Sequence, residues 1–210
     1  MDYSSQNIVI IDYGMGNVGS IINMIKYLGA KATVSNEYAV IKGADKLILP
    51  GVGHFDRAME NITKHGLNDV IREMALEMKK PFLGICLGMQ LMCNSSEEGK
   101  CAGLELVDAD VKRFNFSDNR DLKIPHMGWN YTKPHKKSNI LNNLNELSRF
   151  YFVHSYFVDC ANQNDVLTNT TYGNTFVSSF EHENLIGVQF HPEKSHRFGI
   201  NLFKNFLHYY

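Results

Sequence analysis

The feature that most constrains this chain is an apolar run of strand length that ends in a cysteine with glycines close by on both sides. Residues 81–90 read Pro-Phe-Leu-Gly-Ile-Cys-Leu-Gly-Met-Gln, and residues 87–92 suit a helix. A strand that turns sharply into a helix needs small flanking residues, here Gly84 and Gly88, because the backbone passes close to its neighbours. The pattern predicts a nucleophile elbow that places Cys86 at a helix N-terminus, where the helix dipole favours a thiolate.

A second feature lies far along the chain, where a β-rich run ends in His191-Pro192-Glu193. On its own, the pattern at Cys86 is more often a small buried cysteine between incidental glycines. The proline biases His191 toward an extended backbone, so His191 and Glu193 project to the same side. Glu193 could then accept the Nδ1 proton of His191 and leave the other ring nitrogen to exchange a proton with Cys86. Together the two features predict a catalytic triad.

These residues carry a family resemblance. Gly84-Ile-Cys-Leu-Gly-Met-Gln90 with His191-Pro-Glu193 resembles the class I, or triad, glutamine amidotransferases. Within that family, four segments are similar to the glutaminase subunits of imidazole glycerol phosphate synthases: Pro-Gly-Val-Gly-His-Phe at 50–55, Pro-His-Met-Gly-Trp-Asn at 125–130, Tyr-Phe-Val-His-Ser-Tyr at 151–156 and His-Pro-Glu-Lys-Ser at 191–195. The sequence around Glu105 departs from the family's preference for a glycine or other small residue there.

The resemblance implies an enzyme that hydrolyses the side-chain amide of L-glutamine and needs no metal or organic cofactor. It implies a heterodimer with a (β/α)8-barrel cyclase subunit, which uses the ammonia to make imidazole glycerol phosphate and an aminoimidazole carboxamide ribotide in histidine biosynthesis. The implied catalytic residues are Cys86, His191 and Glu193, and the implied oxyanion donors are Leu87 and the loop of Gly51, Val52 and Gly53. The implied glutamine-binding residues are Gln90, Glu98, Ser155 and Tyr156. The implied partner interface contains Asn17, Ser20, Met127, Trp129, Tyr151 and Lys194.

Composition excludes several other classes of protein. The 210 residues are 44% hydrophobic and 20% charged, which is typical of one globular domain over residues 1–210. A formal net charge of -1 gives no electrostatic basis for binding nucleic acid. We expect a cytoplasmic protein, because neither a signal peptide nor an apolar run of membrane-spanning length is visible. The cysteines show neither a C-x-x-C pair nor a zinc-like spacing, so we expect free thiols at Cys86, Cys93, Cys101 and Cys160.

Strands alternate with helices in the first half of the chain. This order predicts an α/β fold with a mainly parallel central sheet flanked by helices, as in flavodoxin-like proteins, and with additional antiparallel strands in the second half. The predicted strands are 7–12, 31–35, 46–49, 81–85, 107–116, 150–158, 166–172, 175–181 and 185–191, and the predicted helices are 20–28, 55–64, 67–79, 87–92 and 198–208.

Four smaller expectations concern local structure. Met74 and Met78 belong to an apolar stripe of the 67–79 helix and should pack in the core. Residues 125–128 are poor strand formers and read as an exposed loop, and residues 117–121 read as a turn. His154, in the aromatic strand 150–158, is expected to be structural.

Three alternatives remain open. Gly14-Met-Gly16-Asn-Val-Gly19 is a G-x-G-x-x-G pattern between a strand and a helix, and with Glu37 beyond it the chain could be a nucleotide-binding module. A cysteine peptidase of similar fold would act on peptides without a partner. A paralogous glutaminase would supply ammonia to another synthase, for example one that modifies a surface sugar.

Overall fold

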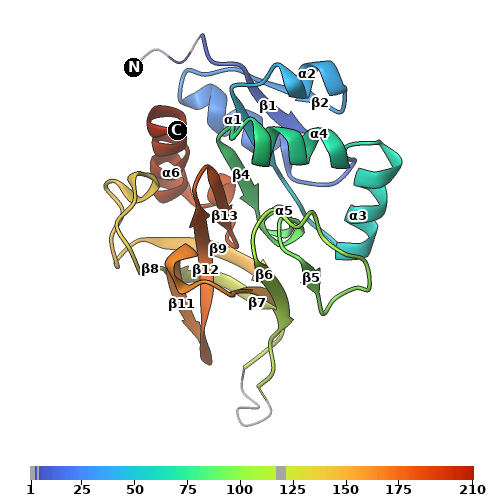
Figure 1. Ribbon diagram of the computed structural model, residues 1–210. Helices are drawn as coiled ribbons and strands as arrows, with labels where there is room; N and C mark the ends of the chain where they lie inside the picture. The colour runs from blue at the N-terminus through green and yellow to red at the C-terminus, as the bar shows by residue number, and fades with distance from the viewer. Residues whose placement is uncertain (1–2, 4, 117–121) are drawn as a thin grey trace.

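The fold comes from a computed structural model that describes residues 3, 5–116 and 122–210, so the turn predicted at residues 117–121 lies outside the described residues. Strands and helices alternate in the first half as predicted (Figure 1). The strands there are β1 (Ile8–Ile11), β2 (Ala32–Ser35), β3 (Lys46–Leu49) and β4 (Phe82–Ile85). The helices are α1 (Val18–Tyr27), α2 (Tyr38–Lys42), α3 (Phe55–Lys64), α4 (Asn68–Arg72) and α5 (Leu87–Leu91).

The central sheet is parallel, in the order β2-β1-β3-β4-β13, where β13 is Leu185–Val188. Numbered along the chain this is the 2-1-3-4-5 order of flavodoxin-like folds, so the predicted fold class is confirmed. Successive side chains of each strand enter different cores, because the period of a strand is two residues. One core lies under α2, α3, α4 and α5, and the other under α1 and α6 (His196–Tyr209) (Figure 1).

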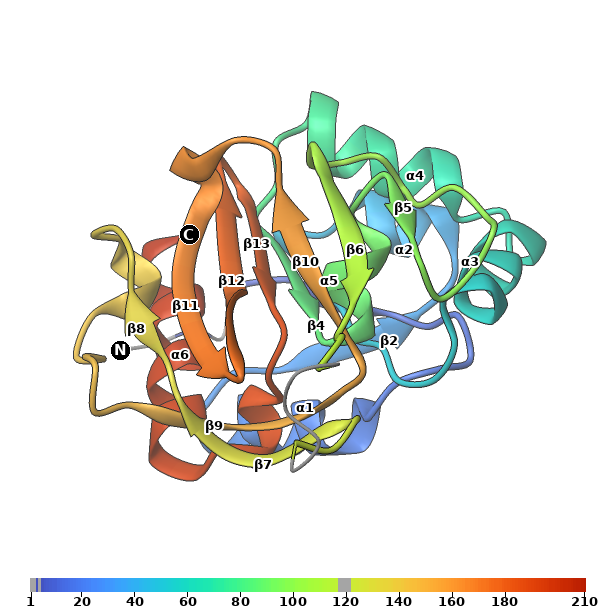
Figure 2. The same ribbon diagram turned by 90° about the horizontal axis from the view of Figure 1, so that it is seen from below.

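Antiparallel strands from the second half extend this sheet. Beyond β13 follow β12 (Asn174–His182), β10 (Tyr156–Cys160) and β6 (Ala109–Arg113), with the short β5 (Ser95–Ser96) at the edge. On a branch, β11 (Val166–Tyr172) pairs with β12 and with β8 (Lys133–Pro134). Strands β11 and β12 form a hairpin, and its turn residue Gly173 has a φ of 71°. Figure 2 shows β7 (His126–Tyr131) and β9 (Arg149–His154) side by side as a separate two-stranded sheet.

The expectation for Met78 is wrong. The predicted helix over 67–79 consists of α4 followed by a π-helical turn, Glu73–Glu77. A π turn contains more residues than an α turn, so it rotates the side chains that follow it away from the original stripe. Met74 and Ala75 are buried, whereas Met78 is 51% exposed.

Two predictions for the second half are also wrong. His126, Met127 and Gly128 belong to strand β7 rather than to a loop, because β9 supplies a hydrogen-bonding partner that local propensity does not reveal. The aromatic run 150–158 forms two strands that part at Ser155: β9 pairs with β7, while β10 pairs with β6 and β12. This break places the residues around Ser155 where two sheets meet.

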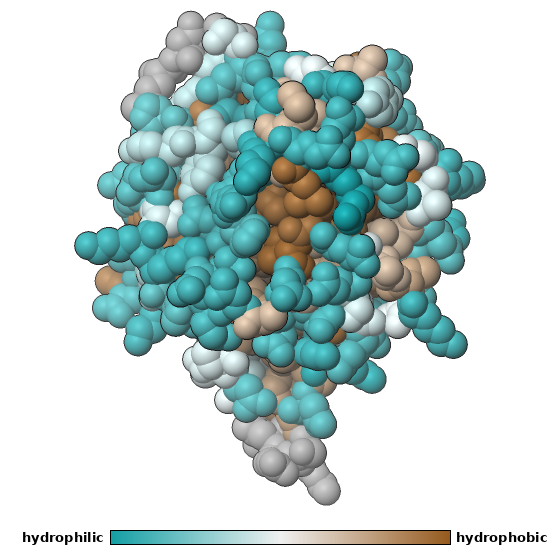
Figure 3. Space-filling model, viewed as in Figure 1, coloured by the Kyte–Doolittle hydropathy of each residue, from teal (hydrophilic) through white to brown (hydrophobic). Residues whose placement is uncertain are grey.

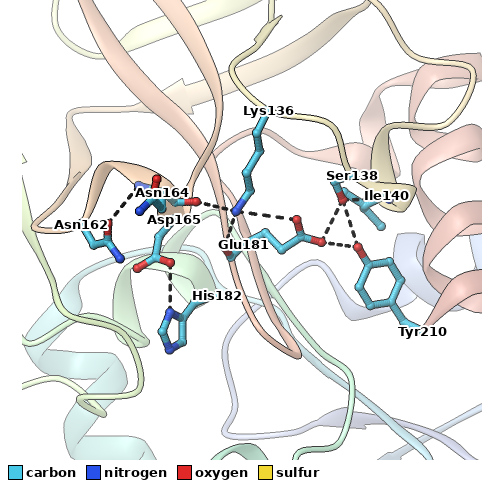
Figure 4. Close-up of polar contacts among 9 residues, drawn as sticks. All are labelled: Lys136, Ser138, Ile140, Asn162, Asn164, Asp165, Glu181, His182 and Tyr210. Carbon is cyan, nitrogen blue, oxygen red and sulfur yellow. Dashed lines mark hydrogen bonds and ion pairs between the residues drawn. The ribbon is translucent and has the colours of Figure 1, made fainter.

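A polar network ties the end of α6 to the sheet (Figure 4). Lys136 Nζ donates to the carbonyl oxygens of Asn164 at 2.6 Å and Glu181 at 2.8 Å. The Glu181 carboxylate accepts from Ser138 Oγ at 2.8 Å and from the hydroxyl of Tyr210. These bonds fix together the segment after β8, strand β12 and the residue that follows α6.

On the face drawn in Figure 3, hydrophilic residues surround a small apolar hollow. In the described part of the chain, none of the helices has the length and apolar character that a membrane crossing requires.

Candidate active site

Cys86 lies at the turn between β4 and α5, with φ 55° and ψ −109°, a conformation that is costly for a residue with a side chain. Close packing holds it there. A Cβ atom at Gly84 would lie 2.8 Å from the carbonyl oxygen of Gly88, and one at Gly88 would overlap the carbonyl oxygen of Leu49. Both flanking positions therefore require glycine, and the predicted strand–cysteine–helix turn is present.

His191 follows β13, which lies next to β4 in the sheet. Its backbone N–H donates to the carbonyl oxygen of Tyr151 at 2.8 Å, which fixes an extended residue after the strand has ended. Glu193 lies in a single 3-10 turn, Pro192–Lys194, rather than in the expected extended segment. The turn still places the Glu193 carboxylate beside the ring: Nδ1 of His191 and Oε1 of Glu193 are 2.8 Å apart, and both side chains are 1% exposed.

Hydrogen bonds give the His191 ring a defined direction. Because an ionised carboxylate only accepts, Nδ1 of His191 carries the proton in the bond to Glu193. Asn17 Nδ2 also donates to Oε1 of Glu193, at 3.2 Å. Nε2 of His191 is buried and has no hydrogen-bond partner among the described residues. This nitrogen is therefore the one available to exchange a proton.

Charge on neighbouring groups sets the protonation of His191. Burial alone lowers the pKa of the ring, but the interactions of the ring with the Cys86 and Glu193 side chains outweigh burial and raise the pKa above its usual value. A raised pKa favours a ring that holds a proton next to the sulfur. The arrangement can form a thiolate–imidazolium pair, the state in which a cysteine attacks a carbonyl carbon.

Cys86 and His191 open onto one cavity of about 310 Å³. The residues lining it are Val52, Gly53, Cys86, Leu87, Gln90, Glu98, Pro125, Val153, His154, Ser155, Tyr156 and His191. All four residues expected to bind glutamine are among them. A cavity of this size with polar groups on several sides suits a small polar molecule.

Two of the expected glutamine-binding side chains also make bonds within the protein. Nε2 of Gln90 donates to the carbonyl oxygen of Tyr156 at 3.2 Å and to Oε1 of Gln189 at 2.9 Å. Oε2 of Glu98 accepts from the backbone N–H of Phe55 at 2.8 Å and so holds the start of α3. These bonds fix both side chains before any ligand arrives.

The expected oxyanion donors lie against the elbow. Leu87 is the first residue of α5, so its N–H has no acceptor within the helix. Val52 and Gly53 line the cavity, whereas Gly51 does not. A Cβ atom at Gly51 would lie 2.5 Å from the backbone nitrogen of Gly88, so the loop is pressed against the turn that carries Cys86.

The residues expected at a partner interface lie on the surface beside His191 and Glu193. Met127 and Trp129 of β7 are 62% and 43% exposed. The rings of Trp129 and Tyr151 are in edge contact at 6.3 Å, and Nζ of Lys194 lies 5.8 Å from the centre of the Tyr151 ring. Ser20 and Lys194 line a hollow of about 380 Å³ together with Glu193, which Asn17 also contacts.

Sequence reasoning missed four residues at the site: Pro125, Val153 and His154 in the cavity wall, and Gln189 behind Cys86. His154 is buried and bonded to His126, as expected of a structural residue, yet it also lines the cavity. Gln189 could have been found from sequence, because it is a lone polar residue in an otherwise apolar strand end just before His191.

The glycine-rich loop after β1 packs against protein and does not form an open cradle. A Cβ atom at Gly16 would lie 2.8 Å from Cβ of Pro50, and the Tyr13 hydroxyl donates to the Pro50 carbonyl oxygen at 2.6 Å. Gly19 has open space at its Cβ position, so it lacks the close helix–strand packing that gives the third glycine of a dinucleotide motif its role. Glu37 is the N-cap residue of α2. The loop supports the Pro50–Gly51 backbone.

The chain matches the family "Glutamine amidotransferase class-I" over residues 9–209. It is 52% identical to the Methanococcus maripaludis protein named "Imidazole glycerol phosphate synthase subunit HisH 2" and 49% identical to the Pseudomonas aeruginosa protein of the same name, each over 95% of this chain and 98% of the relative. A Leptospira borgpetersenii protein named "Imidazole glycerol phosphate synthase subunit HisH" is 42% identical, over 94% of this chain and 97% of the relative.

Solved structures share the fold at low identity. A crystal structure of a glutamine amidotransferase has a TM-score of 0.73 at 18% identity, with 95% of this chain and 96% of that chain covered. A structure of PurLQS from Thermotoga maritima has a TM-score of 0.73 at 16% identity, with 97% and 98% covered.

Proposed function

Because this chain belongs to the class I glutamine amidotransferase family, we propose that it is the glutaminase subunit of an imidazole glycerol phosphate synthase, with residues 1–210 forming one amidotransferase domain. The observation that carries the proposal is a strained elbow cysteine whose cavity also contains a buried histidine paired with a carboxylate. The names of relatives that are 40–52% identical over nearly the whole chain support the histidine pathway.

The proposed reaction uses Cys86, His191 and Glu193 as a triad. The Cys86 thiolate attacks the side-chain carbonyl carbon of glutamine and forms a tetrahedral intermediate. His191, protonated at Nε2, gives that proton to the departing ammonia, and a thioester remains. His191 then takes a proton from water, which attacks the thioester and releases glutamate. Glu193 keeps the ring oriented through Nδ1 and stabilises its positive charge.

The rest of the cavity binds the substrate and its developing charge. The N–H groups of Leu87 and of the Gly51–Gly53 loop stabilise the oxyanion. Because both N–H groups of Gln90 Nε2 are used within the protein, Gln90 offers its carbonyl oxygen, which suits the α-ammonium group of glutamine. Glu98 also favours that cationic end, and Ser155 and Tyr156 complete the lining of the cavity.

A glutaminase in this pathway needs a second subunit that consumes its ammonia. We place the (β/α)8-barrel cyclase on the surface formed by Asn17, Ser20, Met127, Trp129, Tyr151 and Lys194. Exposed aromatic and methionine side chains are typical of such interfaces. The cyclase takes up the ammonia and makes imidazole glycerol phosphate and the aminoimidazole carboxamide ribotide.

The free thiols at Cys86, Cys93, Cys101 and Cys160 suit the reducing cytoplasm.

Reconstitution with the cyclase from the same genome tests the proposal. The complex should convert the ribulosyl intermediate to imidazole glycerol phosphate with glutamine as the only nitrogen source, and neither chain alone should do so. A complex that forms but makes no product from glutamine contradicts the proposal.

A second candidate is a paralogous glutaminase that serves another synthase. The relatives from M. maripaludis and P. aeruginosa both carry the number 2 in their names, which is the observation that favours it. Affinity purification of the chain from its native cell, followed by identification of the bound subunit, separates the two. Recovery of the histidine-pathway cyclase supports the first candidate, and recovery of a different synthase supports the second.

A further inference from the structure

Gln189 is a completely buried polar residue in direct contact with the sulfur of Cys86. It follows β13, and its backbone N–H donates to the carbonyl oxygen of Ser178 at 2.9 Å, so its main chain is fixed. Its side chain is 0% exposed. Nε2 of Gln189 lies 3.7 Å from Sγ of Cys86, within the range of a hydrogen bond to sulfur. The reaction proposed above assigns no role to this contact.

A chain of bonds determines which end of the Gln189 amide faces the sulfur. The Tyr156 carbonyl oxygen can only accept, so Gln90 must present its Nε2 there. The same Nε2 reaches Gln189 at 2.9 Å, and therefore the Gln189 atom on that side must be the acceptor Oε1. The remaining end of the Gln189 amide is the NH₂ group, and it points to Cys86. The orientation follows from donor and acceptor chemistry alone.

A buried donor at this position distinguishes between the two forms of the cysteine. A thiolate accepts hydrogen bonds strongly, whereas a thiol accepts weakly. Cys86 Sγ also lies 4.0 Å from the carbonyl oxygen of Val153, which can only accept a hydrogen bond from a thiol. Rotation of Sγ toward Val153 would suit the protonated state, and contact with Gln189 suits the ionised state.

We infer that Gln189 is a positioning residue that holds the Cys86 thiolate in place for attack while its carbonyl oxygen orients Gln90 in the substrate cavity. One amide thereby links the nucleophile to a wall of the glutamine site. The inference rests on the proposed glutaminase function only for the identity of the substrate, since the contact with the sulfur is independent of it.

Two substitutions of similar size separate the two roles. Gln189→Glu keeps an acceptor for Gln90, and in its ionised form it replaces the donor at the sulfur with an oxygen that only accepts. Gln189→Met removes both contacts and conserves volume, so the core remains filled. Gln163→Met, at an exposed position, is the matched control. All variants carry Cys101→Ser, because Cys101 is the cysteine outside the core.

The readout is the rate at which iodoacetamide alkylates Cys86 in the isolated chain, followed by mass spectrometry across a pH series. Loss of a hydrogen bond to a charged group should lower the rate at pH 7 about tenfold in both Gln189 variants and move the alkylation profile to higher pH. In the cyclase complex, turnover should fall in both, while KM for glutamine should rise mainly in Gln189→Met. Gln163→Met should match the parent.

Alkylation profiles of the Gln189 variants that coincide with the parent profile would overturn the inference. If either variant fails to fold, the other one decides the question, and Gln90→Met provides a further comparison: it should alter KM while leaving most of the alkylation rate. Failure of the proposed function would look different, because the parent complex would not hydrolyse glutamine while the alkylation shift persisted.

Discussion

At the residue scale, the site consists of buried polar groups whose orientations are fixed by bonds to the protein. Glu193 and Asn17 fix one side of His191, and the remaining ring nitrogen is buried without a partner among the described residues. A buried polar atom without a hydrogen-bond partner costs free energy. Nε2 of His191 therefore marks a position where a reacting group supplies the missing hydrogen bond.

The roles of His191 and Glu193 predict an order of effects. His191→Ala deletes the group proposed to transfer protons and should lower turnover by about 10²–10⁴-fold. Glu193→Gln should cost less, because the amide still contacts the ring but no longer stabilises its charge. Both effects should appear in kcat more than in KM, measured as glutamine hydrolysis by the cyclase complex. Glu60→Gln, at an exposed position, is the control. A larger loss for Glu193→Gln would count against the assigned roles.

Local sequence revealed some of these residues and concealed others for a physical reason. Cys86 is recognisable because its strained turn demands glycines nearby, and His191 because the next residue is proline. Gln189 and His154 act through contacts with segments that are distant in sequence, with Gln90 and Cys86 in one case and His126 in the other. Gln189 is visible in the sequence as a polar residue in an apolar strand end, but no spacing in the chain shows which residues Gln189 or His154 contacts.

At the element scale, the predictable elements are those with a clear period of their own. Helix α3 spans Phe55–Lys64 as predicted, because its apolar residues recur with helical spacing. Strand β7 and the break at Ser155 were not predictable, because they depend on which sheet each segment joins. The π turn at Glu73–Glu77 rotates the side chains that follow it, and no local sequence pattern indicates this rotation.

Gly88 is closely packed at the elbow and Gly19 is not, so their substitutions by alanine should have opposite effects on the free energy of unfolding. Gly88→Ala places a carbon against the Leu49 carbonyl and should lower the free energy of unfolding by about 1–3 kcal/mol. Gly19→Ala, in α1 with open space around it, should raise that free energy by up to about 1 kcal/mol. Urea unfolding of both variants measures the difference. Equal free energies of unfolding for the two variants would show that the elbow backbone moves to accommodate the added carbon.

The hydrogen-bonded pair of His126 in β7 and His154 in β9 predicts that the free energy of unfolding depends on pH. Burial lowers the pKa of His126 to about 4 and that of His154 to about 3. Each imidazole therefore stays neutral in the folded chain while the unfolded chain binds a proton below about 6.5. The free energy of unfolding should fall as the pH drops from about 6.5 toward 4.

Urea unfolding across this pH range tests the expectation. His126→Gln removes one of the two groups and should make the fall shallower, although the variant starts from lower stability. His135→Gln, at an exposed position, should keep the parent's slope. Parent and His126→Gln curves with the same slope would contradict the account.

At the scale of the whole molecule, the site joins the two halves of the chain. Strands β4 and β13 pair in parallel from Phe82 with Leu185 to Ile85 with Val188, so the residues that follow them emerge at the same edge of the sheet. Cys86 and His191 meet there, and residues of β9 and β10 also line the cavity. The alternation of elements predicted the parallel half, but the branch at β12 depends on long-range pairing.

We expect the partner to control activity by bringing one oxyanion donor of the Gly51–Gly53 loop into place. The isolated chain should therefore hydrolyse glutamine slowly. The cyclase with its acceptor ligand should raise turnover by about a hundredfold to a thousandfold, because loss of one oxyanion donor typically lowers turnover by that factor. Val52→Pro removes the N–H that would supply this donor and should abolish the activation, whereas Val52→Ala keeps the N–H and should be activated normally. Full activity of the wild-type chain alone would refute this prediction.

The most direct test of the account compares nitrogen sources for the reconstituted complex that carries Cys86→Ser. The variant should form the complex and make imidazole glycerol phosphate from an added ammonium salt at the rate of the wild type, while its glutamine-dependent rate should fall to a trace. Cys101→Ser should use both nitrogen sources normally. Glutamine-dependent product formation that survives Cys86→Ser would contradict the claim that this chain generates ammonia at Cys86.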